Sequence, residues 1–308
     1  MADTRRSDRR ESTQLCAHRP PFHTPAITAS LRRDCSTRLF MPGGEHRHLD
    51  PGSQLTSPSY LSRGEFGAEV GVPRLLDLFS RYDIKTTFCT PGHSMVTFPR
   101  QIEQIMAAGH EIASHGCYHE RIPDLEPERE RELMIKQIEQ YNAVVGGRPR
   151  GYRSPAWDYS SVTTQLLEEF GYEWDSSLMG RDFEPYRPRT VTLNWETANT
   201  FGTESSVLEL PVSWYLDDWP PMEFAPGISA GLGDHDLLYR RWKDIFDCAR
   251  QHYEAAVYVL TIHPQCSGRA HMIGVLDRLI QHMGSHPDVW FASLSEVFDC
   301  WRDDSDTF

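Results

Sequence analysis

From Gly64 to Trp301 the sequence alternates short β-branched or aromatic runs with amphipathic segments, and this alternation constrains the fold more than any other feature. Predicted strands cover residues 85–90, 110–114, 151–154, 172–176, 207–212, 255–262 and 289–292. Predicted helices cover residues 70–82, 98–108, 127–145, 161–170, 234–253, 271–283 and 294–301. Repeated strand–helix units give parallel strands covered by helices. The sequence therefore predicts one α/β domain, either a barrel or an open doubly wound sheet, with a loop of about thirty residues before the strand at 207–212.

Residues 1–60 lack a sustained period and are rich in Pro, Ser, Thr, Arg and His. The whole chain has 31 Lys and Arg against 44 Asp and Glu, a net charge of −13, whereas residues 1–40 are basic. The acids within the first eleven residues disfavour a mitochondrial presequence. We expect an irregular basic leader over residues 1–60 with a short strand near 37–41, a barrel domain over 61–302 and a tail over 303–308.

The charge and hydropathy of the chain exclude several classes of partner. An acidic body does not attract nucleic-acid phosphates or anionic membranes. The longest mostly apolar run, residues 255–262, is far shorter than the roughly 20 residues of a membrane helix. The seven cysteines are scattered and form no CxxC pair, which is typical of reduced thiols. We expect a cytoplasmic protein that binds neither nucleic acid nor membrane.

Polar and aromatic side chains follow the predicted strands, at the edge where parallel α/β proteins build their active sites. They are His93, His115, His119, Arg153, Trp157, Trp214, Asp217, Asp218 and His263. If the segment at the two adjacent aspartates is extended, at most one of the two carboxylates points inward. The convergence of imidazole, guanidinium, carboxylate and indole groups predicts an active site at this edge.

The histidines in this set suit different roles. His115 and His119 have the spacing of two imidazoles that reach one cation, and Gly116 between them frees the backbone. The alternative is a helix-capping or surface pair. His110 lies in the Gly109-His110-Glu111 turn where its strand begins, at the end opposite the rim, and we expect it to be structural.

His263 follows the most hydrophobic predicted strand, and a histidine held there suits a general acid. The alternative is a structural histidine at the rim. Arg153 either orients a carboxylate through a bidentate pair or braces a buried acid. Trp157 and Trp214 either form an apolar wall for a sugar ring or flat heterocycle, or cap the core.

Three ordered motifs resemble the polysaccharide deacetylase (NodB-homology) superfamily: SHGCYH at 114–119, GYRSPAW at 151–157 and LTIHP at 260–264. Further segments, residues 65–72 and 214–219 with Gly268-Arg269, are similar to the branch of allantoinase-like and peptidoglycan-deacetylase-like enzymes. The resemblance covers roughly residues 60 to 302. It implies a distorted (β/α) barrel and a metal-dependent hydrolase.

The resemblance also implies a role for each matching residue. His115 and His119 would bind a divalent metal, with zinc favoured, Arg153 would orient a catalytic base, and His263 would be the general acid. The reaction implied is hydrolysis of a non-peptide C–N bond, in N-acetylated sugars or small cyclic amides. The branch suggests a homotetramer. The side chains expected to contact the carbohydrate or small-molecule substrate are His93, Trp157, Trp214 and Asp218.

One family element is absent from the sequence. The family places an Asp-x-Asp or similar acidic element after its first strand, and the expected neighbourhood, residues 36–45, has none. Two histidines alone would hold zinc weakly, and loss of the base costs about a hundredfold or more in rate. We therefore expect a first strand that is missing or divergent. The alternative function is a non-catalytic ligand-binding or scaffold descendant of the same barrel.

Overall fold

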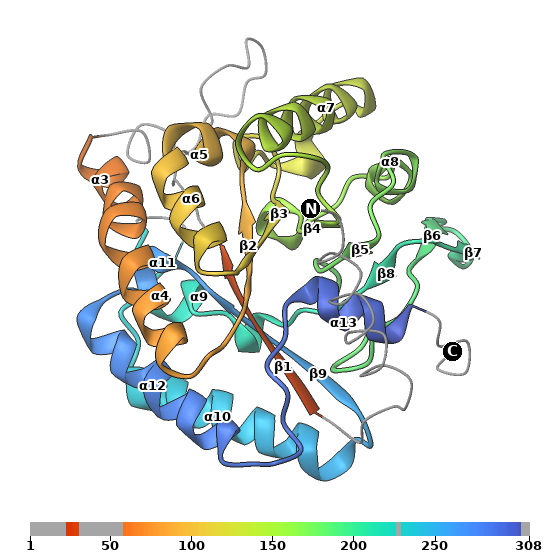
Figure 1. Ribbon diagram of the computed structural model, residues 1–308. Helices are drawn as coiled ribbons and strands as arrows, with labels where there is room; N and C mark the ends of the chain where they lie inside the picture. Colours follow the sequence, from red (N-terminus) through yellow and green to blue (C-terminus); the bar gives the residue numbers. More distant parts are fainter. Residues whose placement is uncertain (1–22, 31–57, 226–228, 303–308) are drawn as a thin grey trace, which may run out of the picture.

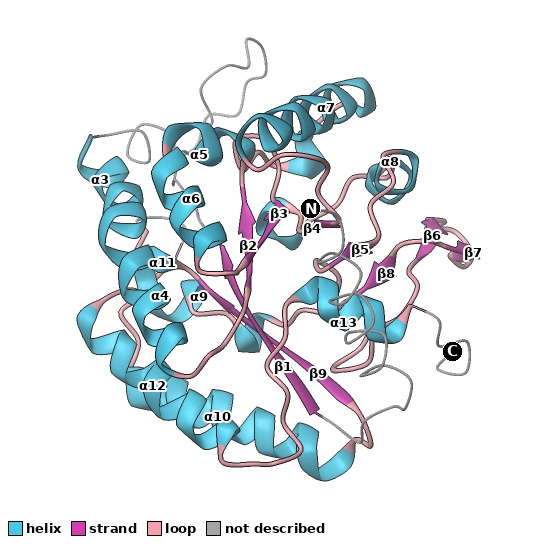
Figure 2. Ribbon diagram, viewed as in Figure 1, coloured by secondary structure: helices cyan, strands magenta, loops and turns pink. Residues whose placement is uncertain are grey.

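The computed structural model describes residues 23–30, 58–225 and 229–302, and a parallel sheet ringed by helices forms its centre (Figures 1 and 2). The strands of this sheet are β1 (His23–Ser30), β2 (Thr87–Thr90), β3 (Glu111–Ser114), β4 (Gly151–Tyr152), β5 (Trp174–Asp175), β8 (Leu208–Glu209) and β9 (Ala256–Ile262). They lie in the order β8-β5-β4-β3-β2-β1-β9, and all neighbours are parallel. A parallel bridge between Asp217 and Thr261 joins the segment after β8 to β9, so the two ends of the sheet meet. The predicted distorted (β/α) barrel is confirmed.

The hydrophobic pattern of the sequence explains how this barrel is packed. Every residue of β9 is buried, as expected for a parallel strand covered on both faces. The outer layer includes α4 (Val72–Arg81), which buries Val72, Leu75, Leu78 and Phe79 along one face. Two long helices, α10 (His235–His252) and α12 (Ala270–Gly284), lie side by side outside β9 (Figure 1).

The remaining helices continue the alternation. They are α3 (Pro58–Phe66), α5 (Gly92–Thr97), α6 (Pro99–Ala107), α7 (Pro127–Val144), α8 (Thr163–Glu169), α9 (Trp219–Met222), α11 (Pro264–Ser267) and α13 (Leu294–Trp301). All seven helices predicted from the periodicity are confirmed, within three residues at each end. None of the helices in the described chain combines the length and the apolar character that a membrane crossing requires.

The structure corrects the prediction for the start of the chain. A strand, β1, occupies residues 23–30, where an irregular leader was expected, and it lies between β2 and β9. Pro25 stands in this central strand, opposite Tyr258, and a proline in the sequence argues against a central strand. The first strand is therefore present, but residues 23–30 contain no Asp or Glu. The strand expected near residues 37–41 and the tail at 303–308 lie outside the described residues.

Two further differences concern strands. The long predicted loop contains an antiparallel hairpin, β6 (Arg189–Thr192) and β7 (Thr200–Glu204). All residues of both strands are exposed, so the hairpin lacks the buried–exposed alternation that identifies a strand in sequence. The strand expected over residues 289–292 is not among the strands of the described sheet; this segment leads irregularly into α13.

Candidate active site

The predicted site residues follow the carboxyl ends of three strands of the sheet, and hydrogen bonds join them. His115 follows β3, Arg153 follows β4 and His263 follows β9. The Nδ1 atom of His115 lies 2.8 Å from the Arg153 carbonyl oxygen, and Nη1 of Arg153 donates to Thr261 Oγ1 at 3.2 Å. Thr261 lies two residues before His263 and forms the bridge to Asp217. The carbonyl oxygen of Thr261 accepts the backbone N–H of Asp218 at 3.2 Å, and Asp218 contacts the His263 ring. A chain of hydrogen bonds therefore runs from His115 through Arg153, Thr261 and Asp218 to His263.

His115 and His119 form a close imidazole pair. Their ring centroids are 4.9 Å apart and their planes are nearly perpendicular, at 77°. Because a carbonyl oxygen can only accept, Nδ1 of His115 carries the proton in the bond to Arg153, and the lone pair of the neutral ring is on Nε2. A histidine oriented by a carbonyl at one nitrogen is the usual metal-ligand arrangement. The chemistry of this pair fits a divalent cation of the zinc type.

Unusual backbone conformations shape the two loops that carry these residues. Gly116 has φ +70°, and a Cβ at this position would lie 2.6 Å from Cγ of Pro155. Positive φ also occurs at His119 (66°), Ala156 (55°) and Trp157 (56°), which are not glycines. Each such residue costs of order 1–3 kcal/mol, and such strain clusters at functional sites. The strain supports the assignment of this rim as the site.

Glu120 is a part of the site that the sequence analysis missed. Its carboxylate accepts hydrogen bonds from the backbone N–H groups of Cys117 at 2.9 Å and Tyr118 at 2.6 Å. It therefore holds the loop between His115 and His119 in shape. The available signal was its position: a carboxylate directly after the second histidine can bind the N–H groups of the turn before it.

Arg153 is fully buried and is fixed by oxygen atoms. Its Nε donates to the carbonyl of Ser176 at 2.7 Å and its Nη2 to Oγ of Ser176 at 2.6 Å. The guanidinium carbon lies 6.0 Å from the centroid of the Trp157 ring. These contacts explain how the arginine is positioned, while its predicted role in orienting a base stays a prediction.

His263 and Asp218 form a buried, hydrogen-bonded pair. The Nδ1 atom of His263 lies 2.7 Å from Oδ1 of Asp218, and the backbone N–H of His263 donates to both carboxylate oxygens at 3.0 Å. The hydroxyl of Ser267 donates to the same carboxylate. Asp218, predicted to bind substrate, therefore also fixes the orientation of the imidazole. Its contact with substrate stays a prediction.

Both adjacent carboxylates reach His263, because the segment is extended only in part. Asp217 is extended, but Asp218 has φ −84° and ψ −20°. Oδ1 of Asp217 lies 3.6 Å from Nδ1 of His263, and it accepts a hydrogen bond from the backbone of Trp219 at 2.6 Å. The three side chains are close enough to hold a metal ion. The hydrogen bonds from backbone, hydroxyl and ring instead indicate an oriented histidine.

Trp157 and Trp214 pack against each other and form an aromatic wall, with Trp157 near Arg153. Their ring centroids are 4.2 Å apart with an angle of 34° between the planes. Trp157 is buried, whereas Trp214 is 40% exposed. An aromatic surface that runs from the interior to solvent suits the apolar face of a sugar ring.

His93 follows β2 and lies in the first turn of α5. Its backbone N–H donates to the carbonyl of Cys117 at 2.8 Å, and its ring centroid is 6.1 Å from that of Tyr118. His93 therefore borders the loop that carries the metal-ligand candidates. The substrate contacts predicted for His93, Trp157 and Trp214 stay predictions.

His110 has the structural role expected of it. It is buried between Phe79 and Phe88, and its Nδ1 accepts the backbone N–H of Thr86 at 3.0 Å. Burial, with Lys85 nearby, lowers the pKa of His110 to about 4. The ring is therefore neutral at pH 7 and takes no part in the rim site.

A buried carboxyl pair on β5 and β8 is a second feature that the sequence analysis did not identify. Asp175 and Glu209 are register partners, and neither is exposed. Burial raises the pKa of both groups, and the proximity of the two carboxyls raises that of Glu209 further. Tyr159 donates to Asp175 at 2.6 Å, and the backbone N–H of Ser177 donates to Glu209 at 2.9 Å. The pair lies inside the sheet, where β5 and β8 are register partners.

Comparison with known proteins assigns the chain to a family. Residues 65–174 match the polysaccharide deacetylase family model. The chain is 35% identical over 257 residues to a peptidoglycan deacetylase of Helicobacter pylori, covering 79% of this chain and 87% of that protein. It is 34% identical over 258 residues to the peptidoglycan deacetylase-like protein FGM2 of Gibberella zeae, covering 77% and 76%.

Solved structures agree with the sequence comparisons. A Mycobacterium smegmatis protein assigned to the polysaccharide deacetylases superposes with a TM-score of 0.75 at 32% identity, covering 90% of this chain and 89% of that one. Puue allantoinase shares the fold, with a TM-score of 0.73 at 22% identity and 94% of each chain covered. Deacetylases of this type are hydrolases of carbon–nitrogen bonds other than peptide bonds. With its barrel, its ordered motifs and these relatives, the chain belongs to the polysaccharide deacetylase family.

Proposed function

We propose that this chain removes acetyl groups from N-acetylated sugars by hydrolysing the acetamide C–N bond at the rim site. One observation carries the proposal: the buried Asp218–His263 pair is joined through Thr261 and Arg153 to the His115–His119 pair. The site thus combines a proton donor with candidate metal ligands. Relatives named peptidoglycan deacetylase support this choice of bond.

His115 and His119 would hold the metal of the site. A divalent cation bound there, with zinc favoured, would supply Lewis-acid activation of water and of the amide carbonyl. Neither of the two clusters of three metal-ligand side chains found in the described chain includes these histidines. Within the described residues, β1 (23–30) supplies no acid, so this proposal assigns two nitrogen ligands, and two ligands alone predict weak binding.

His263 would give its proton to the departing amine. Its Nδ1 is engaged by Asp218, so Nε2 is the nitrogen that can face a substrate. A buried carboxylate at Nδ1 stabilises the imidazolium and fixes the ring, as in other acid–base histidines. The Asp218 carboxylate would therefore supply both the orientation and the charge that a general acid needs.

The aromatic wall favours a sugar. Trp157 and Trp214 present a continuous surface from the interior to solvent, on which one ring of an oligosaccharide would pack. The small cyclic amides suggested by the sequence are the competing substrate class. A cytoplasmic location and a homotetramer stay predictions.

The experiment is an acetate-release assay on the zinc-loaded full chain with N-acetylated chitooligosaccharides, run beside a ureide-release assay with allantoin. We expect acetate from the sugar and no turnover of allantoin, and we expect His115→Ala to remove the activity with its zinc. Turnover of allantoin alone would overturn the substrate class. A folded wild-type chain that hydrolyses neither compound would identify a non-catalytic descendant of the barrel.

A further inference from the structure

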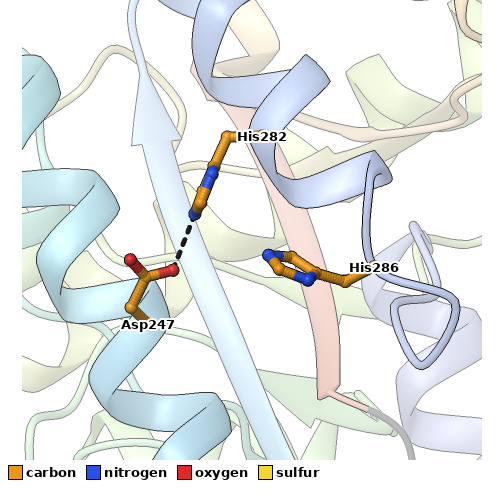
Figure 3. A group of neighbouring side chains, drawn as sticks. All are labelled: Asp247, His282 and His286. Carbon is orange, nitrogen blue, oxygen red and sulfur yellow. Dashed lines mark hydrogen bonds and ion pairs between the residues drawn. The ribbon is translucent and has the colours of Figure 1, made fainter.

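A second cluster of metal-ligand side chains lies on the outside of the barrel, between α10 and α12. Asp247 belongs to α10, His282 to the last turn of α12, and His286 to the turn that follows that helix. One ligand atom from each residue lies within 4.8 Å of the other two. Figure 3 shows the three side chains converging, with a ring nitrogen of His286 facing the His282–Asp247 pair.

The three groups are held in place before any ligand arrives. Nε2 of His282 lies 2.6 Å from Oδ1 of Asp247, and the His282 and His286 rings are perpendicular with centroids 5.2 Å apart. The buried ring of Phe246 lies under both imidazoles, at 5.8 Å and 5.9 Å between centroids. One side of the cluster is therefore apolar and rigid, and the half-buried side chains leave the other side accessible.

His286 has one ring nitrogen that the protein does not use. Its Nε2 atom is buried and has no hydrogen-bond partner within the described part of the chain. Burial, together with Arg250 and His282 nearby, lowers the pKa of His286, so the ring is neutral and carries a lone pair at pH 7. A buried polar atom without a partner is costly, and a metal ion would satisfy it.

Asp247 supplies the carboxylate in its charged form. Burial opposes its ionisation, but hydrogen bonds from Lys243 and His282 outweigh burial and lower the pKa of Asp247. Lys243 contacts Oδ2 and His282 contacts Oδ1, so the oxygen facing the imidazoles is the one that a cation would share. The charge of Arg250 is paired separately with Asp288, at 2.8 Å.

We propose that Asp247, His282 and His286 form a surface site for a transition-metal dication of the zinc type, which fastens α10 to the end of α12. Two imidazoles and one carboxylate suit zinc, nickel or copper, whereas calcium and magnesium prefer oxygen ligands alone. With three protein ligands, water would complete the coordination. To admit the ion, the His282–Asp247 hydrogen bond must open and the proton on Nε2 of His282 must move to Nδ1 of the same ring or to solvent. The site is independent of the hydrolase site.

The test measures zinc binding in the full-length chain carrying His115→Ala and His119→Ala, so that this histidine pair contributes nothing. Titration calorimetry of this protein should give one zinc per chain. A zinc concentration a hundredfold above the dissociation constant should raise its melting temperature by about 5 °C or more. Two further variants are made in this background, His286→Gln and Asp247→Asn, and the asparagine keeps the shape of the aspartate side chain. Each should remove most of the zinc binding and most of the rise in melting temperature.

The matched control is His271→Gln in the same background. His271 lies at the other end of α12 and faces His235 of α10, with ring centroids 5.8 Å apart, but this pair belongs to no three-residue metal-ligand cluster of the described residues. Binding should be unchanged in this control. The proposal is overturned if the parent protein binds no zinc, or if His286→Gln and His271→Gln reduce binding equally. Because circular dichroism will verify folding of each variant, loss of structure cannot imitate loss of the site.

Discussion

The carboxylate of Asp218 decides what His263 can do, because it contacts both the ring Nδ1 and the backbone N–H of that histidine. In Asp218→Asn the amide no longer stabilises a protonated ring and can donate to Nδ1, which favours the wrong tautomer. We expect kcat for acetate release to fall by about a hundredfold or more, with little change in KM. Steady-state kinetics on a chitooligosaccharide measure kcat and KM separately for both proteins.

Asp217→Asn is the control for this prediction. Asp217 is also buried, but its Oδ1 lies 3.6 Å from Nδ1 of His263 and accepts the backbone N–H of Trp219. Asp217→Asn should therefore lose clearly less activity than Asp218→Asn. Equal losses in the two variants would show that general burial of charge, and not the contact with His263, explains the effect.

The lowered pKa of His110 makes the stability of the fold depend on pH. Its pKa in the folded chain is about 4, below the value near 6.5 of an unfolded chain. Its stabilising contribution is therefore complete above pH 6.5 and is lost as the pH falls toward 4, because the unfolded chain takes up the proton first. Between pH 7.5 and pH 5 this one group should cost about 2 kcal/mol of the free energy of unfolding.

The measurement is urea unfolding of the wild type and of His110→Asn at these two pH values. The asparagine oxygen can still accept the Thr86 N–H, but it does not titrate. The variant should lose less stability between pH 7.5 and pH 5 than the wild type does. Identical losses would mean that His110 is not held neutral in the folded chain.

At the scale of elements, the loop between β3 and α7 depends on a glycine. Gly116 has φ +70°, and an added Cβ would meet Pro155 at 2.6 Å and Glu120 at 3.2 Å. Gly171 also has φ +70°, but nothing lies within 4 Å of its Cβ position. An alanine at Gly171 therefore adds backbone strain alone, whereas an alanine at Gly116 adds backbone strain and a steric clash.

We expect Gly171→Ala to cost about 1 kcal/mol of unfolding free energy through its left-handed backbone alone. Gly116→Ala should cost about 1–3 kcal/mol more, because the packed site cannot expand freely. It should also reduce zinc binding and acetate release, since His115 and His119 flank the shifted turn. Thermal and chemical denaturation of both variants provide the comparison, and equal costs would contradict the contact with Pro155.

The elements that could be predicted from sequence are those whose burial follows a regular period. The face of α4 and the apolar run of β9 are visible because one face or both faces of the element are buried. β1 could not be recognised, because Pro25 is an unfavourable residue for a central strand and tertiary pairing overrides that local preference. The β6–β7 hairpin is exposed along its whole length and leaves no hydrophobic signal.

At the scale of the whole molecule, the site could be predicted because the barrel brings the carboxyl ends of all its strands to one rim. His115, Arg153 and His263 were identified on this basis, and the structure connects them through hydrogen bonds by way of Thr261 and Asp218. The partners that position them, Glu120 and Ser176, could not be predicted in the same way. Their contacts depend on loop conformation, which sequence periods do not encode.

The central claim is that one rim site binds metal through His115 and donates a proton through His263. The most direct test is acetate release from a chitooligosaccharide by zinc-loaded wild type, His263→Gln and His115→Ala, with the zinc content of each protein determined by elemental mass spectrometry. The account predicts that His263→Gln retains the zinc of the wild type but loses nearly all acetate release, whereas His115→Ala loses acetate release together with the rim zinc, one ion per chain fewer than the wild type. Equal loss of zinc in His263→Gln, or undiminished acetate release from it, would contradict the account.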